Sequence, residues 1–140
     1  MTTNCVPVIQ GMFAETEKGA RLLGSKCVTC GAAYFPKSPL CHNPDCTEQR
    51  IEDAVFGPRG KLWSFAVQYY APPPPVKYDE PFVPFAIGVV DMPEGLRVLG
   101  RLAIDDVKKI KIGMDVELVI DRLCGDRDGN QVVTWKFRPL

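Results

Sequence analysis

Two pairs of cysteines decide the fold of this chain: Cys27-Val28-Thr29-Cys30-Gly31, and then Cys41-His42-Asn43-Pro44-Asp45-Cys46. The two-residue gap of the first pair lets both sulfurs of a tight turn point at a single metal ion. Four thiolates complete a tetrahedral shell at about 2.3 Å around zinc and leave no open position for water or substrate. The stretch therefore predicts a structural metal site whose ligands are Cys27, Cys30, Cys41 and Cys46.

The residues around the cysteines favour zinc and leave alternatives. Gly31 can adopt the positive φ that turns the backbone and brings amide N–H groups toward the sulfurs. His42 is the only histidine of the chain, so a shell of three cysteines and His42 is one alternative. A lone iron held by the same thiolates and a pair of disulfides are two more. The spacing is typical of a zinc ribbon, which we expect over residues 25–56.

Composition excludes several classes of protein. The chain has 140 residues, of which 46% are hydrophobic, enough for one modest core. Its 17 basic and 17 acidic residues give a net charge of zero, which argues against a nucleic acid as the main partner. No stretch approaches the roughly 20 apolar residues of a membrane span, and residues 1–5 do not resemble a signal peptide. We therefore expect a cytoplasmic protein with no membrane or nucleic-acid partner.

The segments on either side of the predicted ribbon lack a clear period. Residues 1–24 carry apolar positions without a sustained helical or strand pattern, so we expect an N-terminal arm that packs on something else, or a mobile terminus. Tyr34-Phe35-Pro36 is expected to be a strand between the two cysteine turns. Residues 51–60 end in Gly57-Pro58-Arg59-Gly60 and are interpreted as a linker into a second module.

From Lys61 onward the sequence alternates in the manner of β-strands. Five strands are expected, over residues 61–70, 82–91, 96–102, 114–123 and 131–137. A short helix capped by Asp105 is expected between the third and fourth, and residues 126–130 are expected to form a hairpin turn. Five strands with one short helix in this position are the order of an OB-type barrel, which we expect over residues 57–140.

A proline-rich stretch, Ala71-Pro72-Pro73-Pro74-Pro75-Val76-Lys77-Tyr78, separates the first two of these strands. Consecutive prolines cannot donate to a β-ladder and favour a polyproline II segment, so the stretch predicts a stiff exposed loop. It is either a connection between strands or a docking arm on which Tyr69, Tyr70 and Tyr78 contact a partner.

The chain resembles a known family in several places. The segment Leu22-Leu23-Gly24-Ser25-Lys26-Cys27-Val28-Thr29-Cys30-Gly31 is followed by Tyr34-Phe35-Pro36 and the second cysteine pair, and then by Phe85-Ala86-Ile87-Gly88-Val89-Val90 and Glu94-Gly95-Leu96-Arg97-Val98. These are similar to the rubredoxin-like zinc ribbon plus OB-fold proteins called domain of unknown function thirty-five. The resemblance runs from about Gly11 to the end; the gap between Cys41 and Cys46 is longer than in many relatives.

The resemblance implies a non-catalytic accessory subunit of a thiolase-fold acyl-CoA enzyme, in which the small subunit stabilises its partner or shapes the CoA channel. The form with one ribbon, one barrel and a proline-rich loop is most similar to the small subunit of benzoylsuccinyl-CoA thiolase from anaerobic toluene degradation. The implied complex is a hetero-oligomer that carries out acyl-CoA C–C bond cleavage, with its catalytic residues on the partner.

The residues agree that this chain has no active site of its own, because a thiolase-type cysteine needs a histidine and the one histidine lies in the metal loop. Cys5 and Cys124 lie outside the ribbon and are expected to be buried apolar residues. For a CoA molecule shared with the partner, the candidate phosphate contacts are Lys26, Lys37 and Arg59, and the candidate apolar wall is Tyr34 and Phe35.

Two functions of other classes remain open at this point. An OB-type single-strand nucleic-acid binder could stack bases on Trp63, Phe65 and Tyr69. A rubredoxin-like electron carrier could hold iron with the same four cysteines. Neutral charge argues against the first, and the colour of a ferric thiolate site would distinguish the second from zinc.

Overall fold

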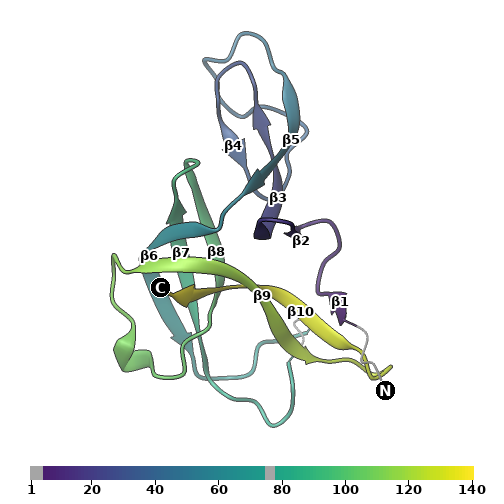
Figure 1. Cartoon of the computed structure of the whole chain (residues 1–140), viewed down its shortest axis with the longest axis vertical. Coiled ribbons are helices and arrows are strands. Elements are labelled where there is room, and N and C mark those ends of the chain that lie inside the picture. The colour runs from purple at the N-terminus through teal and green to yellow at the C-terminus, as the bar shows by residue number, and fades with distance from the viewer. Residues whose placement is uncertain (1–4, 75–77) are drawn as a thin grey trace.

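The computed structural model describes residues 5–74 and 78–140, and it shows a protein built almost entirely from β-strands. Figure 1 shows two parts arranged along the long axis: a small sheet carrying the cysteine loops above, and a barrel below. This confirms the predicted fold class, a zinc ribbon followed by a barrel. Among the described residues, no helix has the length and apolar character that crossing a membrane requires.

Five strands close the barrel. They are β6 (Arg59–Gln68), β7 (Phe85–Met92), β8 (Leu96–Leu102), β9 (Asp115–Gly125) and β10 (Gln131–Pro139). Neighbouring strands pair in the order β10-β8-β7-β6-β9, and β9 also pairs with β10, which closes the ring. The short contact between β8 and β10 is parallel, and the hairpins β6–β7, β7–β8 and β9–β10 are antiparallel. The predicted five-stranded OB-type barrel is confirmed.

The predicted short helix lies where expected and differs in its cap. It is a single 3₁₀ turn, η1 (Val107–Lys109), between β8 and β9. The side chain that accepts its first free N–H, from Lys108, belongs to Asp106 and not to Asp105. The β9–β10 hairpin turn is also confirmed: the Asp126 carboxylate accepts the N–H groups of Asp128 at 2.9 Å and Asn130 at 2.8 Å.

The ribbon sheet is organised around one long strand. It contains β2 (Phe13–Thr16), β3 (Gly19–Cys27), β4 (Ala33–Tyr34) and β5 (Ile51–Phe56), and β3 pairs antiparallel with the other three. The predicted strand at Tyr34-Phe35-Pro36 is thus present only as far as Tyr34. Residues 51–56, interpreted as the start of a linker, are instead a ribbon strand whose last residue, Phe56, is buried.

The N-terminal stretch is not an arm separate from the two sheets. β1 (Cys5–Pro7) pairs parallel with β10 and extends the barrel sheet (Figure 1), while residues 13–24 form β2 and most of β3 in the ribbon. The alternation of buried and more exposed residues in this stretch is difficult to recognise from the sequence. The strands β2 and β3 are joined by a turn of only two residues, and the buried positions Ala20, Leu22 and Gly24 alternate with an arginine and with a leucine that is itself apolar. The expected residues 1–4 of the arm lie outside the described residues.

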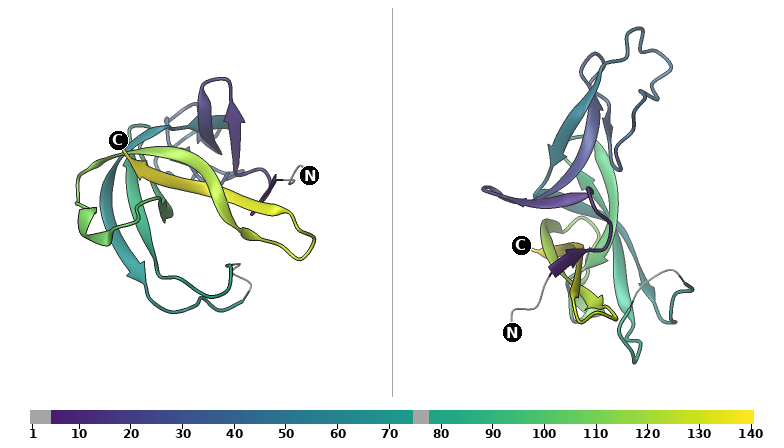
Figure 2. Two further views of the ribbon diagram at one scale, coloured as in Figure 1. Left: turned by 60° about the horizontal axis from the view of Figure 1, so that its bottom comes forward. Right: turned by 90° about the vertical axis from the view of Figure 1, so that its right-hand side faces the viewer.

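The two parts share a core. Leu22 and Phe56 from the ribbon sheet belong to the same buried cluster as Leu62, Leu118 and Phe137 from the barrel. A second contact is aromatic, since the rings of Phe13 and Phe35 lie 5.9 Å and 5.6 Å from the indole of Trp135. The side view of Figure 2 shows the lower end of the ribbon sheet against the barrel, with the cysteine loops projecting away from it.

Candidate functional site

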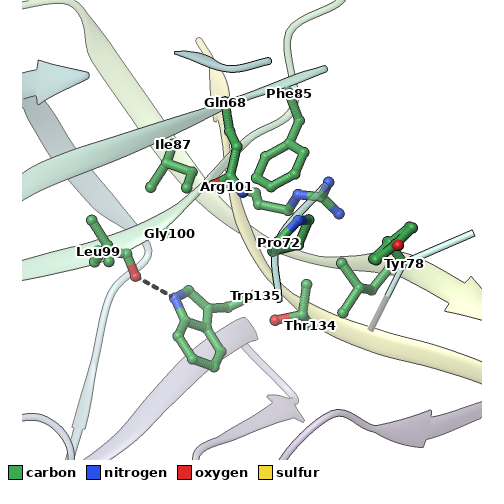
Figure 3. Close-up of a pocket in the computed structure, with 11 residues that line it drawn as sticks. Gln68, Pro72, Tyr78, Phe85, Ile87, Leu99, Gly100, Arg101, Thr134 and Trp135 are labelled. Carbon is green, nitrogen blue, oxygen red and sulfur yellow. Dashed lines mark hydrogen bonds between the residues drawn. The ribbon is translucent and has the colours of Figure 1, made fainter. Parts of the chain in front are cut away.

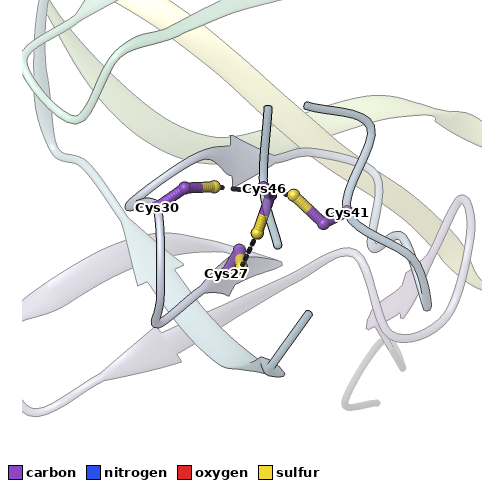
Figure 4. A group of neighbouring side chains, drawn as sticks. All are labelled: Cys27, Cys30, Cys41 and Cys46. Carbon is purple, nitrogen blue, oxygen red and sulfur yellow. Dashed lines mark hydrogen bonds between the residues drawn. The ribbon is translucent and has the colours of Figure 1, made fainter. Parts of the chain in front are cut away.

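The structure gathers the four cysteine sulfurs predicted to bind metal. All four lie within 4.8 Å of one another, and Figure 4 shows them converging from two loops. The sulfurs of Cys27 and Cys46 are 3.8 Å apart, and those of Cys30 and Cys41 are 3.5 Å apart. A tetrahedral shell with 2.3 Å bonds has edges of about 3.8 Å, whereas a disulfide bond is about 2.05 Å long. The spacing therefore fits a metal shell and not disulfides.

Two turns bring the cysteines to this position. Gly31 has φ +79°, as expected, and its N–H donates to the carbonyl of Cys27 at 2.8 Å, which closes the first turn. In the second, the N–H of Cys46 donates to the carbonyl of Asn43 at 3.1 Å, and the Asn43 side chain accepts the N–H of Asp45 at 3.0 Å. The longer gap between Cys41 and Cys46 is thus folded back by a local turn.

Hydrogen bonds to the sulfurs shift their pKa values. Backbone N–H groups, first that of Arg50 and then that of Cys30, lower the pKa of Cys27 to about 6. The Tyr34 hydroxyl donates to the Cys41 sulfur at 3.6 Å, which lowers the pKa of Cys41 and raises that of Tyr34. Burial, and then the neighbouring Cys27 sulfur, raises the pKa of Cys46 to about 12. Four thiolates this close repel one another, and a bound cation would offset that repulsion.

A second layer of residues holds the loops in place. Ser25 is buried, and its hydroxyl donates to the carbonyl of Ser38 at 3.1 Å while accepting the Ser38 N–H at 2.9 Å. The Gln49 amide donates to the carbonyl of Cys41 at 3.3 Å and accepts its N–H at 3.4 Å. Neither residue was identified from the sequence, because each contacts a residue outside its own local turn, Ser25 at Ser38 and Gln49 at Cys41.

His42 does not join the four sulfurs. Its Nε2 atom lies 2.8 Å from the Ser38 hydroxyl, its ring packs edge-on against Tyr34, and its side chain is exposed. The group of candidate ligands formed by the described residues contains the four cysteines without it. This arrangement favours the four-cysteine shell over the shell that includes His42.

The five residues predicted to contact CoA lie in different surroundings. Lys37 forms an ion pair with Asp53 at 3.1 Å, and Lys26 on β3 lies opposite Glu52 on β5 in the strand register. Tyr34 is bonded to the metal loop and Phe35 packs on Trp135. Arg59 is exposed on β6, opposite Glu117 on β9. Their role in CoA binding stays a prediction.

The proline-rich loop is tied to the β9–β10 hairpin. The Asp79 carboxylate accepts the N–H of Gly125 at 2.9 Å and pairs with Arg122 at 2.7 Å; the first contact and then the second lower the pKa of Asp79. Tyr69 and Tyr70 are 70% and 76% exposed, whereas Tyr78 packs against Phe82. The predicted polyproline segment includes Pro75, which lies with residues 76 and 77 outside the described residues.

The other two cysteines differ from each other. Cys124 is buried, as expected, but Cys5 is exposed on strand β1, so the expectation of burial is wrong for Cys5. The exposure of Cys5 is set by the position of β1 at the edge of the barrel sheet, and the sequence alone does not indicate that position.

The sequence did not reveal a pocket on the outer face of the barrel (Figure 3). It has a volume of about 290 Å³ and is lined by Gln68, Pro72, Tyr78, Phe85, Ile87, Leu99, Gly100, Arg101, Leu123, Thr134 and Trp135. The sequence feature that could have indicated the pocket is the alternation of side chains along β7 and β8. Phe85, Ile87 and Leu99 are apolar residues at positions on the face opposite the buried residues.

Comparison with known proteins agrees with this architecture. Residues 20–52 match the family model "ChsH2, rubredoxin-like zinc ribbon domain", and residues 54–121 match "ChsH2, C-terminal OB-fold domain". A "DUF35 domain-containing scaffold protein" of Methanocaldococcus jannaschii is 32% identical over 122 residues, which cover 85% of this chain and 82% of that protein. This chain belongs to the DUF35 family. The resemblance noted in the sequence is thereby confirmed.

Two further similar proteins carry the name of an enzyme or of an enzyme subunit. A "Benzoylsuccinyl-CoA thiolase subunit BbsA" of Thauera aromatica is 29% identical, with 85% of this chain and 76% of that subunit covered. A solved structure described as "Ltp2-ChsH2(DUF35) aldolase" superposes with a TM-score of 0.61 at 28% identity, covering 85% of this chain and 84% of that one. The similarity thus spans the ribbon and the barrel together.

Proposed function

We propose that this DUF35 protein is a zinc-containing, non-catalytic accessory subunit of a thiolase-fold acyl-CoA enzyme. The observation that carries the proposal is the match along nearly the whole chain to a protein named as a thiolase subunit, of which 76% is covered. The structure described as an aldolase containing a DUF35 chain supports an association of the same kind. In this role the chain stabilises its partner and helps shape the partner's acyl-CoA site.

Zinc is the metal that we assign to Cys27, Cys30, Cys41 and Cys46. Thiolates are soft ligands that suit zinc, and the sulfur separations of 3.5 and 3.8 Å fit a closed tetrahedral shell. A closed shell offers no position for a substrate, so the metal would contribute folding free energy and no catalytic chemistry. Metal analysis would distinguish zinc from the alternative, iron in the same shell.

The surroundings of the one histidine support a non-catalytic role. A cysteine nucleophile of the thiolase type needs a histidine within hydrogen-bond reach. His42, within the second cysteine loop, is instead hydrogen-bonded to Ser38 and packed against Tyr34. The catalytic groups are therefore proposed to lie on the partner.

The finer proposal concerns the partner and the CoA. Benzoylsuccinyl-CoA thiolase of anaerobic toluene degradation is the proposed partner, on the basis of the relatives that carry this name in Thauera aromatica and Geobacter metallireducens. For the CoA phosphates, Lys37 is the first candidate to test. It has a matched control in Lys61, which also forms a single exposed ion pair, with Asp115 at 3.1 Å.

The test is affinity purification of the tagged chain from its native host, followed by mass spectrometry, metal analysis and extraction of bound CoA. We expect a stoichiometric thiolase-fold enzyme and one zinc per chain. With the purified complex, Lys37→Glu should weaken CoA binding and Lys61→Glu should not. A chain recovered alone, or with iron or nucleic acid, would overturn the accessory-subunit proposal; equal CoA affinity in the two variants would exclude only Lys37.

A further inference from the structure

The pocket on the outer face of the barrel has an unusual lining for a protein surface. Side chains on β7 and β8 alternate between the barrel interior and the exterior, and the pocket uses the exterior set. Phe85 and Ile87 from β7, Leu99 from β8 and Trp135 from β10 make it predominantly apolar. The Trp135 indole N–H is already bonded to the carbonyl of Leu99 at 2.9 Å (Figure 3), which fixes the ring as a wall.

Among the described residues that line this pocket, Arg101 is the one that carries a charge. It is half-buried, and its guanidinium lies over the Phe85 ring, 3.6 Å from the centroid. In Figure 3 the side chain extends from β8 beneath Phe85 toward the side formed by Pro72 and Tyr78. The buried Cys124 thiol interacts electrostatically with this guanidinium, but within residues 5–74 and 78–140 no carboxylate forms a salt bridge with it.

A carboxylate on the loop that shares a pocket with Arg101 is already engaged. Asp79 and Arg101 both line a smaller adjoining pocket of about 200 Å³. The Asp79 carboxylate, however, is held by Arg122 at 2.7 Å and by the N–H of Gly125 at 2.9 Å. The cation of Arg101 is therefore left without the carboxylate that could have neutralised it.

A partly desolvated cation that has no carboxylate partner among the described residues has a clear preference for ligands. Burial lowers the pKa of Arg101, but a guanidinium stays protonated in proteins, so it carries its charge into the pocket. Five N–H donors in a planar fork match a carboxylate in a bidentate geometry. One cation in an apolar lining suits a monoanion better than a phosphate dianion, whose second charge would be buried without a partner.

We propose that this pocket binds a small monocarboxylate with an apolar, aromatic-sized body. The carboxylate pairs with Arg101, and the body lies against Phe85, Ile87, Leu99 and Trp135. The volume of about 290 Å³ is at the lower end for ligand pockets, so a body about the size of one ring with a short linker fits and a long acyl chain does not. The proposal does not depend on the accessory-subunit function, because it concerns this chain alone.

The test is a titration of the full-length, zinc-loaded, ¹⁵N-labelled chain with 3-phenylpropionate, and in parallel with its neutral analogue 3-phenylpropionamide. We expect saturable shifts of the Trp135 indole and of β7 and β8 amides with the acid, and roughly tenfold weaker binding of the amide, because a charge-assisted hydrogen bond is lost. Arg101→Gln should remove the preference for the acid, and Arg101→Lys should keep part of it.

Arg97 provides the matched control. It lies on the same strand and over another aromatic ring, 4.1 Å from the centroid of Trp63, but it is paired with Asp91 at 2.7 Å and does not line the pocket. Arg97→Gln should leave both affinities unchanged. The proposal is overturned by the absence of saturable shifts at millimolar ligand, by equal binding of acid and amide, or by an unchanged preference in a folded, zinc-loaded Arg101→Gln protein.

Discussion

The cysteine loops and the barrel are stabilised in opposite ways. Between residues 28 and 50, all of which are described, Cys41 is the only buried residue, and the only strand is the two-residue β4. The barrel instead encloses a continuous cluster that includes Leu62, Val98, Val116 and Phe137. Little apolar area is buried within the loops, where Phe35 is half-buried against Trp135, so we expect their structure to depend mainly on the proposed metal, whereas the barrel depends on the hydrophobic effect.

The boundary between these two regimes, stabilisation by the proposed metal and stabilisation by apolar burial, lies inside the ribbon. At the lower end of β3 and β5, Leu22 and Phe56 belong to the barrel's cluster, and at the upper end Cys27 belongs to the sulfur group. Gly24 lies between them, where an added Cβ would come within 2.6 Å of the Phe56 ring. The comparison teaches that the ribbon sheet is a connector, packed on the barrel at one end and dependent on metal at the other.

The largest effect is expected from removal of the metal. Cys27→Ser, or chelation of the metal, should abolish stoichiometric zinc binding and the amide-exchange protection of residues 28–50, because structural zinc contributes on the order of 10 kcal/mol to folding. The barrel strands β7 and β8 should stay protected. Metal analysis and hydrogen exchange measure both.

Cys5→Ser is the control for this prediction, because Cys5 is exposed and lies outside the sulfur group. It should leave the zinc content and the protection pattern as they are. A Cys27→Ser protein with ordered loops, or one whose barrel unfolds together with them, would contradict the division between the two regimes.

The second effect acts on the barrel. Phe137 is fully buried, with 0% of its surface exposed, so Phe137→Ala should lower the free energy of unfolding by about 3–5 kcal/mol through lost burial and a cavity. Urea unfolding monitored by barrel amide resonances measures this. Val55→Ala, at a side chain that is 58% exposed on β5, should change stability by less than about 0.5 kcal/mol. Equal losses in the two variants would refute the assignment of the core.

The smallest effect is expected at the proline-rich loop, which belongs to neither regime. The pKa of Asp79 is lowered by the Gly125 N–H and then by Arg122, so the folded state binds its proton less tightly than the unfolded state does. The stability that this carboxylate contributes is therefore present above the ordinary aspartate pKa and is lost as the pH falls through the lower, folded value.

A carboxyl-carbon NMR titration checks the pKa of Asp79, and hydrogen exchange of residues 78–84 checks the tether. Asp79→Asn should raise exchange in this loop and leave the metal loops and the barrel unchanged. Asp105→Asn is the control, since Asp106 and not Asp105 caps the 3₁₀ turn. A normal pKa for Asp79, or an unaltered loop in the variant, would show that the tether is not formed in solution.

Much of the architecture could be predicted because its signals are local. The gap between Cys27 and Cys30, the positive φ of Gly31 and the alternation along β7 and β8 each depend on a few neighbouring residues. The strand order with one short helical turn followed from these segments. Strand limits differed by up to three residues, because strand ends are set by pairing with partners elsewhere in the chain.

What could not be predicted depends on which distant segments meet. β1 and β2 were missed because a short strand is stabilised mainly by its neighbour, β10 for one and β3 for the other. The contact of the Tyr34 hydroxyl with the Cys41 sulfur was also not predicted. The strand pairings are long-range, and the Tyr34 contact depends on how the second cysteine loop folds back; spacing along the chain reveals neither.

The sequence by itself determined a pair of cysteine turns with the spacing of metal ligands, a mainly β chain and a five-stranded barrel, because ligand spacing, residue alternation and turn residues are properties of short segments. Only the tertiary structure decided that the N-terminal residues complete both sheets, and that Arg101 lies in an apolar pocket without a salt bridge to any described carboxylate while Asp79 is held by Arg122. The physical reason is that charge neutralisation and pocket shape arise where β7, β8, β10 and the proline-rich loop meet in space.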